Sequence, residues 1–251
     1  RSVEGVRSVQ VEVVTKVVAH AVQRGVQLLP GVKNIVAVAS GKGGVGKSTT
    51  AANLALALAA EGATVGLLDA DIYGPSQPMM MGIDRRPDSL DGKTMEPLVN
   101  HGVQVMSIGF LVNPDQAMIW RGPMATQALE QLLRQTHWKD VDYLVVDMPP
   151  GTGDIQLTLS QRVPITGAVI VTTPQDIALL DARKGITMFE KVGVPILGLV
   201  ENMAVHVCSN CGHAEHIFGE GGGRRLAQEL GMHYLGALPL DLKIRQQADS
   251  G

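Results

Sequence analysis

Aromatic residues are scarce in this chain, at 3% of 251 residues, and only two cysteines are present. So few cysteines exclude the disulfide framework of a small secreted protein. Basic residues are not in excess, with 21 Lys and Arg against 24 Asp and Glu and a formal net charge of −3. This charge gives no support for a nucleic-acid-binding surface or a polybasic membrane anchor. Long hydrophobic runs are also missing, since none reaches the length of about 18 residues that a membrane span requires.

The first residues show neither the hydrophobic core of a signal peptide nor an Arg- and Ser-rich transit pattern. We therefore expect a cytoplasmic protein with no membrane and no nucleic-acid partner. Hydrophobic residues are plentiful at 45%, so a large core of Val, Leu, Ile, Ala and Met can be buried.

Short runs of β-branched and aliphatic residues recur along the chain and alternate with helical stretches. The runs cover residues 35–39, 65–68, 103–108, 143–146, 168–171, 196–200 and, more weakly, 234–238. The helical stretches cover 47–60, 124–135, 177–192 and 224–230. Parallel strands require crossover connections, so this alternation predicts an α/β fold, a doubly wound and mostly parallel sheet of about seven strands. Ligands of such sheets bind at the carboxyl ends of the strands.

Two segments do not follow this alternation. Residues 1–32 are rich in Val with a mixed period, and we interpret them as a connector or the remnant of an N-terminal domain. Residues 73–100 contain many Gly, Pro, Asp and Met, which predicts a long loop or small insertion. The main domain is therefore expected at residues 33–251, with an insertion near 203–219 that contains both cysteines.

A phosphate-binding loop is the strongest motif in the chain. The pattern G-x-x-x-x-G-K-[ST] directly follows the first predicted strand and opens the first predicted helix. In such loops backbone N–H groups face the phosphates, so the nucleotide-binding residues are expected to be Gly41, Lys42, Gly43, Gly44, Val45, Gly46, Lys47, Ser48 and Thr49. Lys47 is expected to reach the β- and γ-phosphates and the Ser48 hydroxyl to ligate Mg²⁺. The alternative, a Gly-rich turn without a ligand, does not explain the Lys-Ser pair or the strand and helix that flank it.

Carboxylates at two strand ends are candidates for the magnesium site and for catalysis. Asp147 ends a buried strand and is expected to hold Mg²⁺ through water, and residues 149–154 are expected to form a switch loop that responds to the γ-phosphate. Asp69 and Asp71 end the second predicted strand, with Asp69 expected near the metal. Asp residues at strand ends also serve as helix caps and turn formers, which is the alternative for Asp69 in particular. Asn202 ends the sixth predicted strand, where its amide could pair with an adenine edge.

The cysteines form a Cys-x-x-Cys pair at Cys208 and Cys211. Two thiolates at this spacing can ligate one metal or cluster, but structural zinc and 4Fe-4S clusters normally take four protein ligands. A twofold homodimer would supply the missing pair. The alternatives are a zinc site completed by His206, His213 or His216, and a thioredoxin-like redox pair. The redox alternative is the weakest, because the motif does not open a helix after the first strand.

The phosphate loop, with its additional Lys42, resembles the deviant Walker A motif of the P-loop family that includes the nitrogenase iron protein, MinD and ParA (the SIMIBI-like class). The resemblance implies that Lys42 reaches the nucleotide of a partner subunit, that Asp71 positions the attacking water and that Asn202 lies at the base site. Catalytic roles are thus expected for Lys42, Lys47, Asp71 and Asp147.

The whole set of motifs resembles the Mrp/ApbC (Nbp-like) iron-sulfur carrier ATPases. The matching segments are residues 41–50, 69–76, 147–154, 201–203, 208–211 and 218–222. The resemblance implies ATP hydrolysis with Mg²⁺, a 4Fe-4S cluster on the paired cysteines of a homodimer, and delivery of that cluster to apoproteins. Mitochondrial relatives exist in this family, so that compartment stays open. Two alternatives also stay open: a MinD- or ParA-like positioning ATPase, and an ATPase dimer clamped by structural zinc.

Overall fold

The computed structural model describes residue 11 and residues 16–20, 25–112 and 122–251. Its centre is an eight-stranded sheet in the order β10-β7-β6-β1-β5-β2-β4-β3. All neighbouring strands are parallel except the pair β3 and β4 at one edge. The strands are β1 (Val32–Ala39), β2 (Val65–Asp69), β3 (Leu98–Asn100), β4 (Val103–Ser107), β5 (Val141–Asp147), β6 (Gly167–Thr172), β7 (Ile196–Glu201) and β10 (Tyr234–Ala237).

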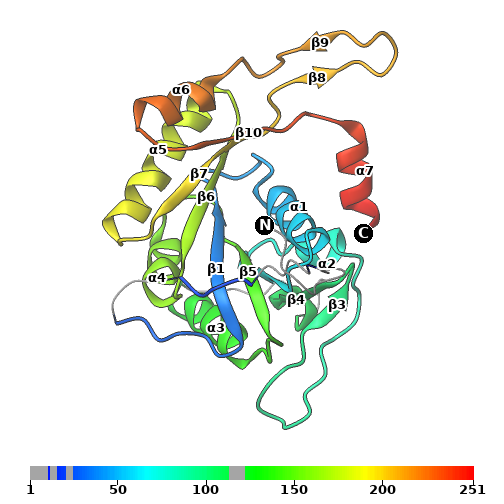
Figure 1. Ribbon diagram of the computed structural model, residues 1–251, viewed down its shortest axis with the longest axis vertical. Helices are drawn as coiled ribbons and strands as arrows, with labels where there is room; N and C mark the ends of the chain where they lie inside the picture. Colours follow the sequence, from blue (N-terminus) through cyan, green and yellow to red (C-terminus); the bar gives the residue numbers. More distant parts are fainter. Residues whose placement is uncertain (1–10, 12–15, 21–24, 113–121) are drawn as a thin grey trace, which may run out of the picture.

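Helices cover both faces of this sheet (Figure 1). On one face lie α1 (Lys47–Ala60), α2 (Gln77–Met80) and α7 (Leu242–Ser250). On the other lie α3 (Gly122–Gln135), α4 (Asp154–Arg162), α5 (Asp176–Lys191) and α6 (Gly222–Glu229). A short 3-10 helix, η1 (Ile108–Phe110), follows β4. The carboxyl ends of the parallel strands therefore meet at one edge, where a doubly wound sheet binds its ligands.

Strands β2, β4 and β6 are buried along their whole length and consist mainly of apolar residues, as expected for parallel strands covered by helices on both faces. The buried polar exceptions within them are Asp69, Gln104, Ser107 and Thr172. The predicted doubly wound, mostly parallel sheet is thus confirmed, and each of the seven predicted runs forms a strand of it. The eighth strand, β3, falls within the predicted loop at residues 73–100, and the antiparallel pair is an addition that the sequence did not indicate.

The segment before β1 packs against the domain where the structure describes it. Leu29 is buried in the core, and the Asn34 amide donates to the Val18 carbonyl oxygen at 2.9 Å. The Asn34 side-chain oxygen accepts from the His20 backbone N–H at 3.0 Å. The interpretation of residues 1–32 as a connector or domain remnant stays a prediction.

A two-stranded hairpin, β8 (His206–Val207) and β9 (Ala214–Glu215), projects beyond the carboxyl end of the sheet (Figure 1). It lies within the insertion predicted near 203–219. Across the residues that the structure describes, no helix is long and apolar enough to cross a membrane.

Candidate functional site

The phosphate loop connects β1 to α1 through a chain of glycines, two of which have a backbone conformation that L residues rarely adopt. Gly44 and Gly46 have φ angles of 80° and 81°. Gly46 also lies against the Asn202 amide, since a Cβ there would come 2.0 Å from Nδ2. Gly41 packs against α5, where a Cβ would lie 2.0 Å from the Asp181 carbonyl oxygen. These close approaches explain why glycine occupies these loop positions.

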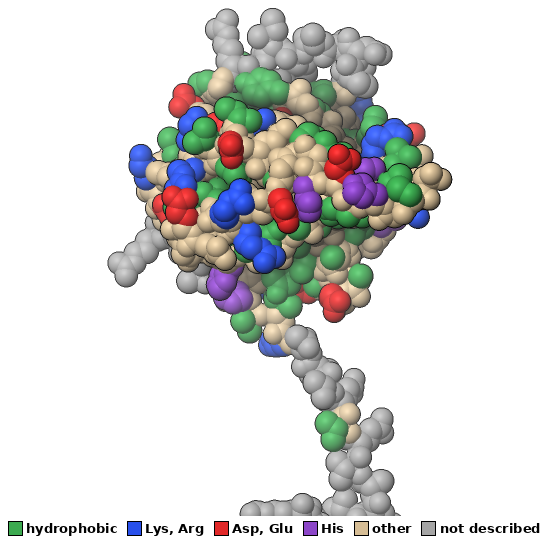
Figure 2. Space-filling view, turned by 90° about the horizontal axis from the view of Figure 1, so that it is seen from above, with side chains coloured by type: hydrophobic (Ala, Val, Ile, Leu, Met, Phe, Trp, Pro, Cys, Tyr) green, Lys and Arg blue, Asp and Glu red, His purple; other side chains and the backbone are tan. Residues whose placement is uncertain are grey.

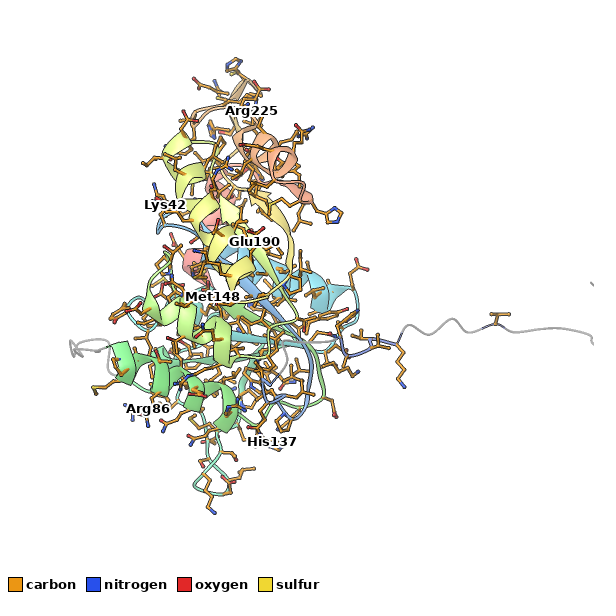
Figure 3. All side chains as sticks on the ribbon, turned by 90° about the vertical axis from the view of Figure 1, so that its left-hand side faces the viewer. Lys42, Arg86, His137, Met148, Glu190 and Arg225 are labelled. Atoms are coloured by element: carbon orange, nitrogen blue, oxygen red, sulfur yellow. The ribbon has the colours of Figure 1, made fainter. Side chains whose placement is uncertain are left out.

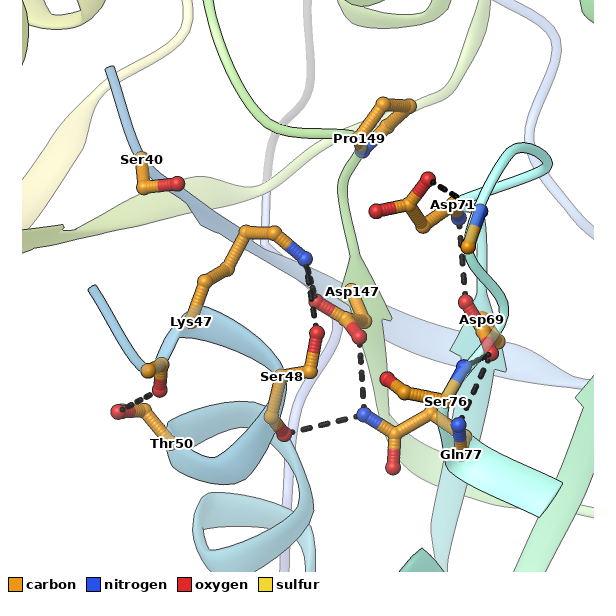
Figure 4. Close-up of polar contacts among 12 residues, drawn as sticks. Ser40, Lys47, Ser48, Thr50, Asp69, Asp71, Ser76, Gln77, Asp147 and Pro149 are labelled. Atoms are coloured by element: carbon orange, nitrogen blue, oxygen red, sulfur yellow. Dashed lines mark hydrogen bonds and ion pairs between the residues drawn. The ribbon is translucent and has the colours of Figure 1, made fainter. Parts of the chain in front are cut away.

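Lys47, Ser48 and Asp147 form the centre of the site (Figure 4). The Lys47 ammonium group pairs with Asp147 Oδ1 and donates to the Ser48 hydroxyl oxygen at 3.0 Å. Lys47 is 6% exposed and Asp147 is fully buried. A cation therefore already lies where the hydroxyl and the carboxylate converge, and this oxygen set fits Mg²⁺, which prefers carboxylate, hydroxyl and water ligands.

Asp69 lies beside Asp147 because the two residues are directly opposite each other on the parallel strands β2 and β5. Burial and the neighbouring Asp147 raise the pKa of Asp69 to about 7, and the backbone N–H groups of Gln77 and Asp71 oppose that rise. Its oxygens also accept from the Ser76 N–H at 3.0 Å and the Ser107 hydroxyl at 3.1 Å. Asp69 thus organises the turn that leads into α2, the capping alternative considered for it, and its role as a metal ligand stays a prediction.

Asp71 follows β2 and is partly exposed toward the site. Its Oδ1 accepts from the Gly74 N–H at 3.2 Å, so the carboxylate is held by the turn that follows it. Burial raises the pKa of Asp71, while the Lys47 charge acts in the opposite direction. Its expected role in positioning water is compatible with this location and stays a prediction.

Two buried glutamines were missed by the sequence reasoning. Gln77, fully buried at the start of α2, donates through Nε2 to the Ser48 carbonyl oxygen at 3.0 Å and to Asp147 Oδ2 at 2.9 Å. Gln156 donates to the Pro149 carbonyl oxygen at 2.8 Å and accepts from the Gly153 N–H at 2.7 Å, so it spans the predicted switch loop. The local pattern does not reveal Gln77, because its partners Ser48 and Asp147 are 29 and 70 residues away. The partners of Gln156 are only three and seven residues away, so the spacing of Gly153 and Gln156 at the start of a helix is a signal that could have identified it.

Of three other predicted site residues, only Asn202 contacts the phosphate loop from another part of the chain. The Asn202 amide, directly after β7, donates to the Val45 carbonyl oxygen of the phosphate loop at 2.9 Å. Thr49 faces away, into a cavity of about 360 Å³ between α1, α2 and α7. Lys42 is half-buried at the hairpin end of the molecule, above Met148 in Figure 3. Within the described residues the structure records no ion pair for its ammonium group.

Cys208 and Cys211 lie in the turn of the β8–β9 hairpin and both are free thiols, Cys211 exposed. The turn is closed by hydrogen bonds from the Cys208 N–H to the His213 carbonyl oxygen at 2.9 Å and from the Gly212 N–H to the Cys208 carbonyl oxygen at 2.8 Å. Backbone N–H groups of Cys211 and Asn210 are the main cause of a lowered pKa of the Cys208 thiol. The pair is thus accessible and favours the thiolate form that binds metal.

The histidines do not complete a metal site with these cysteines. His206 Nδ1 lies 3.0 Å from the Leu240 carbonyl oxygen, and His216 Nδ1 lies 2.7 Å from the Ala204 carbonyl oxygen. Among the described residues, no three His, Cys, Asp or Glu side chains are grouped to hold a metal ion. That the cysteines of two chains together ligate a metal or cluster stays a prediction.

The β8–β9 hairpin begins just after the carboxyl end of β7, where Glu201 makes a contact that the sequence did not predict. Glu201, 2% exposed, accepts a hydrogen bond from the Gly223 N–H at the start of α6. The next residue is Asn202, which contacts the phosphate loop. Met203, at the start of the hairpin segment, has a positive φ of 56°, uncommon outside glycine. The two ends of the cysteine-containing insertion thus meet beside the phosphate loop.

A family model described as ParA, NUBPL iron-transfer P-loop NTPase, matches residues 31–251. A Pseudomonas fragi protein named iron-sulfur cluster carrier protein is 64% identical over 100% of this chain and 88% of its own length. The Escherichia coli K12 protein of the same name is 66% identical over 88% of this chain, and the match covers 60% of that relative. The mouse iron-sulfur cluster transfer protein NUBPL is 58% identical over 89% of this chain and 70% of its own length.

Solved structures share the fold. A nucleotide-binding protein from Archaeoglobus fulgidus in complex with ADP superimposes with a TM-score of 0.78 at 39% identity, covering 87% of this chain and 86% of that one. The cell division ATPase MinD of Pyrococcus furiosus superimposes with a TM-score of 0.62 at 23% identity, covering 86% of each chain, and at that identity it supports the fold alone.

Proposed function

Because this chain belongs to the ParA family of NUBPL iron-transfer P-loop NTPases, we propose that it is an ATP-hydrolysing carrier of 4Fe-4S clusters that acts as a homodimer and delivers clusters to apoproteins. The observation that carries the proposal is the accessible Cys208–Cys211 turn on a hairpin whose base adjoins the phosphate loop. The names of the relatives support the cluster as cargo.

In the nucleotide half of this proposal, the loop amides and Lys47 bind the phosphates of ATP. The Ser48 hydroxyl and the Asp147 carboxylate are the groups that would hold Mg²⁺, which would supply positive charge beside the phosphates. Binding of the phosphates separates Lys47 from Asp147, because Lys47 then contacts the phosphates while Asp147 serves the magnesium site. Asp71 orients the attacking water, and Lys42 acts on the nucleotide of the partner subunit.

In the cluster half, the number of thiols decides the stoichiometry. A 4Fe-4S cluster takes four thiolates and each chain offers two, so one cluster binds between two hairpins across a twofold axis. The β8–β9 hairpin projects from the body of the domain, which leaves its turn accessible to a second copy (Figure 1). The contacts of Asn202 with Val45 and of Glu201 with Gly223 connect this hairpin to the phosphate loop.

Two alternative functions, a zinc-clamped ATPase and a positioning ATPase, predict different properties of the protein. A structural zinc clamp would use the same four sulfurs, without cluster transfer. A positioning ATPase of the MinD or ParA kind would bind a membrane or DNA. DNA or an anionic membrane would require a continuous basic surface. The face that bears the hairpin instead mixes Lys and Arg with Asp, Glu and His side chains (Figure 2), which favours the carrier function over a positioning ATPase that binds through this face.

The test is transfer of a cluster from anaerobically reconstituted protein. We expect about four irons per dimer, and a 4Fe-4S apoprotein acceptor should become active. Cys208→Ala should bind ATP normally, because the phosphate loop is untouched, yet retain and transfer no cluster. Ser209→Ala, in the same turn but without loss of a thiol, is the matched control and should transfer normally.

Stoichiometric zinc without iron after reconstitution would overturn the carrier function and leave a metal-clamped ATPase. Full transfer by Cys208→Ala would equally exclude the hairpin as the cluster site.

A further inference from the structure

Gln77 joins the phosphate loop to the carboxylate at the end of β5 (Figure 4). Its Nε2 donates to the Ser48 carbonyl oxygen and to Asp147 Oδ2, at 3.0 and 2.9 Å. Both neighbours can only accept hydrogen bonds, so the amide NH₂ must face them and the orientation of the side chain is fixed by chemistry. The reverse orientation would bring the amide oxygen against two other oxygens.

This orientation leaves the other end of the amide without a partner. Gln77 is fully buried, and its Oε1 has no hydrogen-bond partner in the described part of the chain. A buried acceptor without a partner is unfavourable. The two donated hydrogen bonds offset that cost, and the one to a carboxylate is of the stronger, charge-assisted kind. Because burying the unpartnered Oε1 is unfavourable, we conclude that Gln77 serves to contact Asp147 rather than to fill space in the core.

The two oxygens of Asp147 have separate partners. Oδ1 pairs with Lys47, and Oδ2 accepts from Gln77. The Gln77 backbone N–H in turn donates to Asp69 Oδ2 at 3.0 Å, so the position of Gln77 is itself held by the neighbouring strand end. When Lys47 turns to the phosphates, the Gln77 amide is the contact that still fixes the carboxylate.

We propose that Gln77 is a positioning residue of the magnesium site: it holds Asp147 Oδ2 so that Oδ1 faces the ion, and it thereby sets the Mg²⁺ dependence of nucleotide affinity. The inference rests on the nucleotide half of the proposed function and is independent of the cluster.

The experiment compares two isosteric substitutions in the full chain. Gln77→Met keeps the length of the side chain and removes both donated hydrogen bonds. The control is Gln104→Met on β4, another buried glutamine, whose amide exchanges two hydrogen bonds of 2.9 Å with the Lys139 backbone and contacts neither Asp147 nor the phosphate loop. Affinity for a fluorescent ADP analogue is measured over a range of Mg²⁺ concentrations and in EDTA, together with the melting temperature.

We expect Gln77→Met to require on the order of tenfold more Mg²⁺ for the same nucleotide affinity, as the loss of a hydrogen bond to a charged group implies. Its affinity in EDTA should equal that of the unmodified protein. Gln104→Met should lower the melting temperature without changing the Mg²⁺ dependence. If Gln77→Met does not fold, Gln77→Asn provides the test, since its amide is one methylene too short to reach both acceptors.

An unchanged Mg²⁺ dependence in the Gln77 variant would overturn the inference, whatever its melting temperature. If the unmodified protein itself binds nucleotide without any effect of Mg²⁺, the nucleotide half of the proposed function fails instead.

Discussion

Lys47 and Asp147 form an ion pair inside a buried site. Their pairing offsets the cost of burying each charge before a ligand binds. Removing one partner of such a pair leaves an uncompensated charge, and that is strongly destabilising. Substitutions in this pair therefore report on both folding and binding, and they need a readout that separates the two.

Asp147→Asn is expected to reduce Mg²⁺-dependent ATP hydrolysis on the order of 100-fold, the upper range for groups that orient a bound metal. Nucleotide binding should fall less, because the loop amides and Lys47 remain. Steady-state hydrolysis and nucleotide titration on the same preparation make the comparison. Equal losses of both, together with a lower melting temperature, would assign Asp147 a folding role.

Cys208 is expected to react as a thiolate at lower pH than an ordinary cysteine. Hydrogen bonds from backbone N–H groups of the turn stabilise the thiolate and lower the pKa of Cys208. A lowered pKa means that the thiolate is already populated below the usual range near 8.5, so the alkylation profile must shift to lower pH. The measurement is the rate of iodoacetamide alkylation against pH in cluster-free Cys211→Ala protein.

The same variant unfolded in guanidinium chloride is the control, since unfolding removes the turn. Identical pH profiles for the folded and unfolded protein would show that the turn does not stabilise the thiolate.

At the scale of elements, α5 packs against the phosphate loop at Gly41 and Gly185, and only Gly185 has space for a larger side chain. A Cβ on Gly41 would lie 2.0 Å from the Asp181 carbonyl oxygen, which is backbone and cannot turn aside. A Cβ on Gly185, within α5, would meet nothing closer than 3.9 Å.

Gly41→Ala should therefore destabilise the fold by about 1–3 kcal/mol, the usual cost of overpacking, and should weaken nucleotide binding because the loop must shift. Gly185→Ala should stabilise by up to about 1 kcal/mol, the helix propensity difference between Ala and Gly. Chemical denaturation of both variants gives the free energies of unfolding. Equal effects of the same sign would contradict this packing.

The elements that the sequence predicted are those with strong local signals. The buried strands β2 and β6 are runs of mainly apolar residues, and α1 follows directly from the Gly-Lys-Ser sequence. The β8–β9 hairpin was expected only as a polar insertion, because strands of two residues carry no periodicity. Helix α4 was not predicted, for a similar reason: it has nine residues and little apolar character.

The candidate site divides in the same way. Lys47, Ser48 and Asp147 lie together around one centre. The motif places Lys47 and Ser48 at the start of α1, and Asp147 ends β5, the strand that pairs with β1 in front of the loop. Gln77 was not predicted, because its importance comes from Ser48 and Asp147, which are 29 and 70 residues away. Tertiary contacts of this kind leave no trace in a local pattern.

At the scale of the whole molecule, the phosphate loop and the cysteines lie at the same end of the sheet. The parallel strands bring their carboxyl ends together there, and the insertion between β7 and α6 extends from that edge (Figure 1). Two copies that join their hairpins would therefore also bring their nucleotide sites toward each other. A dimer of this form predicts that each phosphate site depends on the partner.

Lys42 provides the test of that dependence. It lies at this end of the molecule and is half-exposed, and no ion pair is recorded for it among the described residues, so its ammonium group is available to a partner's nucleotide. Lys42→Ala should keep nucleotide binding, which Lys47 and the loop amides provide, and lose hydrolysis by a factor on the order of 10³–10⁵, as for other cations supplied in trans.

Mixing Lys42→Ala with Asp147→Asn should restore part of the activity. In the mixed dimer one site retains its own Asp147 and receives an intact Lys42 from the other subunit, whereas each homodimer lacks one of the two groups at both sites. The rate is measured against mixing ratio, with each variant alone as control, and it should pass through a maximum near equal amounts. A rate that never exceeds the sum of the two separate variants, together with hydrolysis by monomeric unmodified protein, would show that Lys42 acts within its own subunit or not at all.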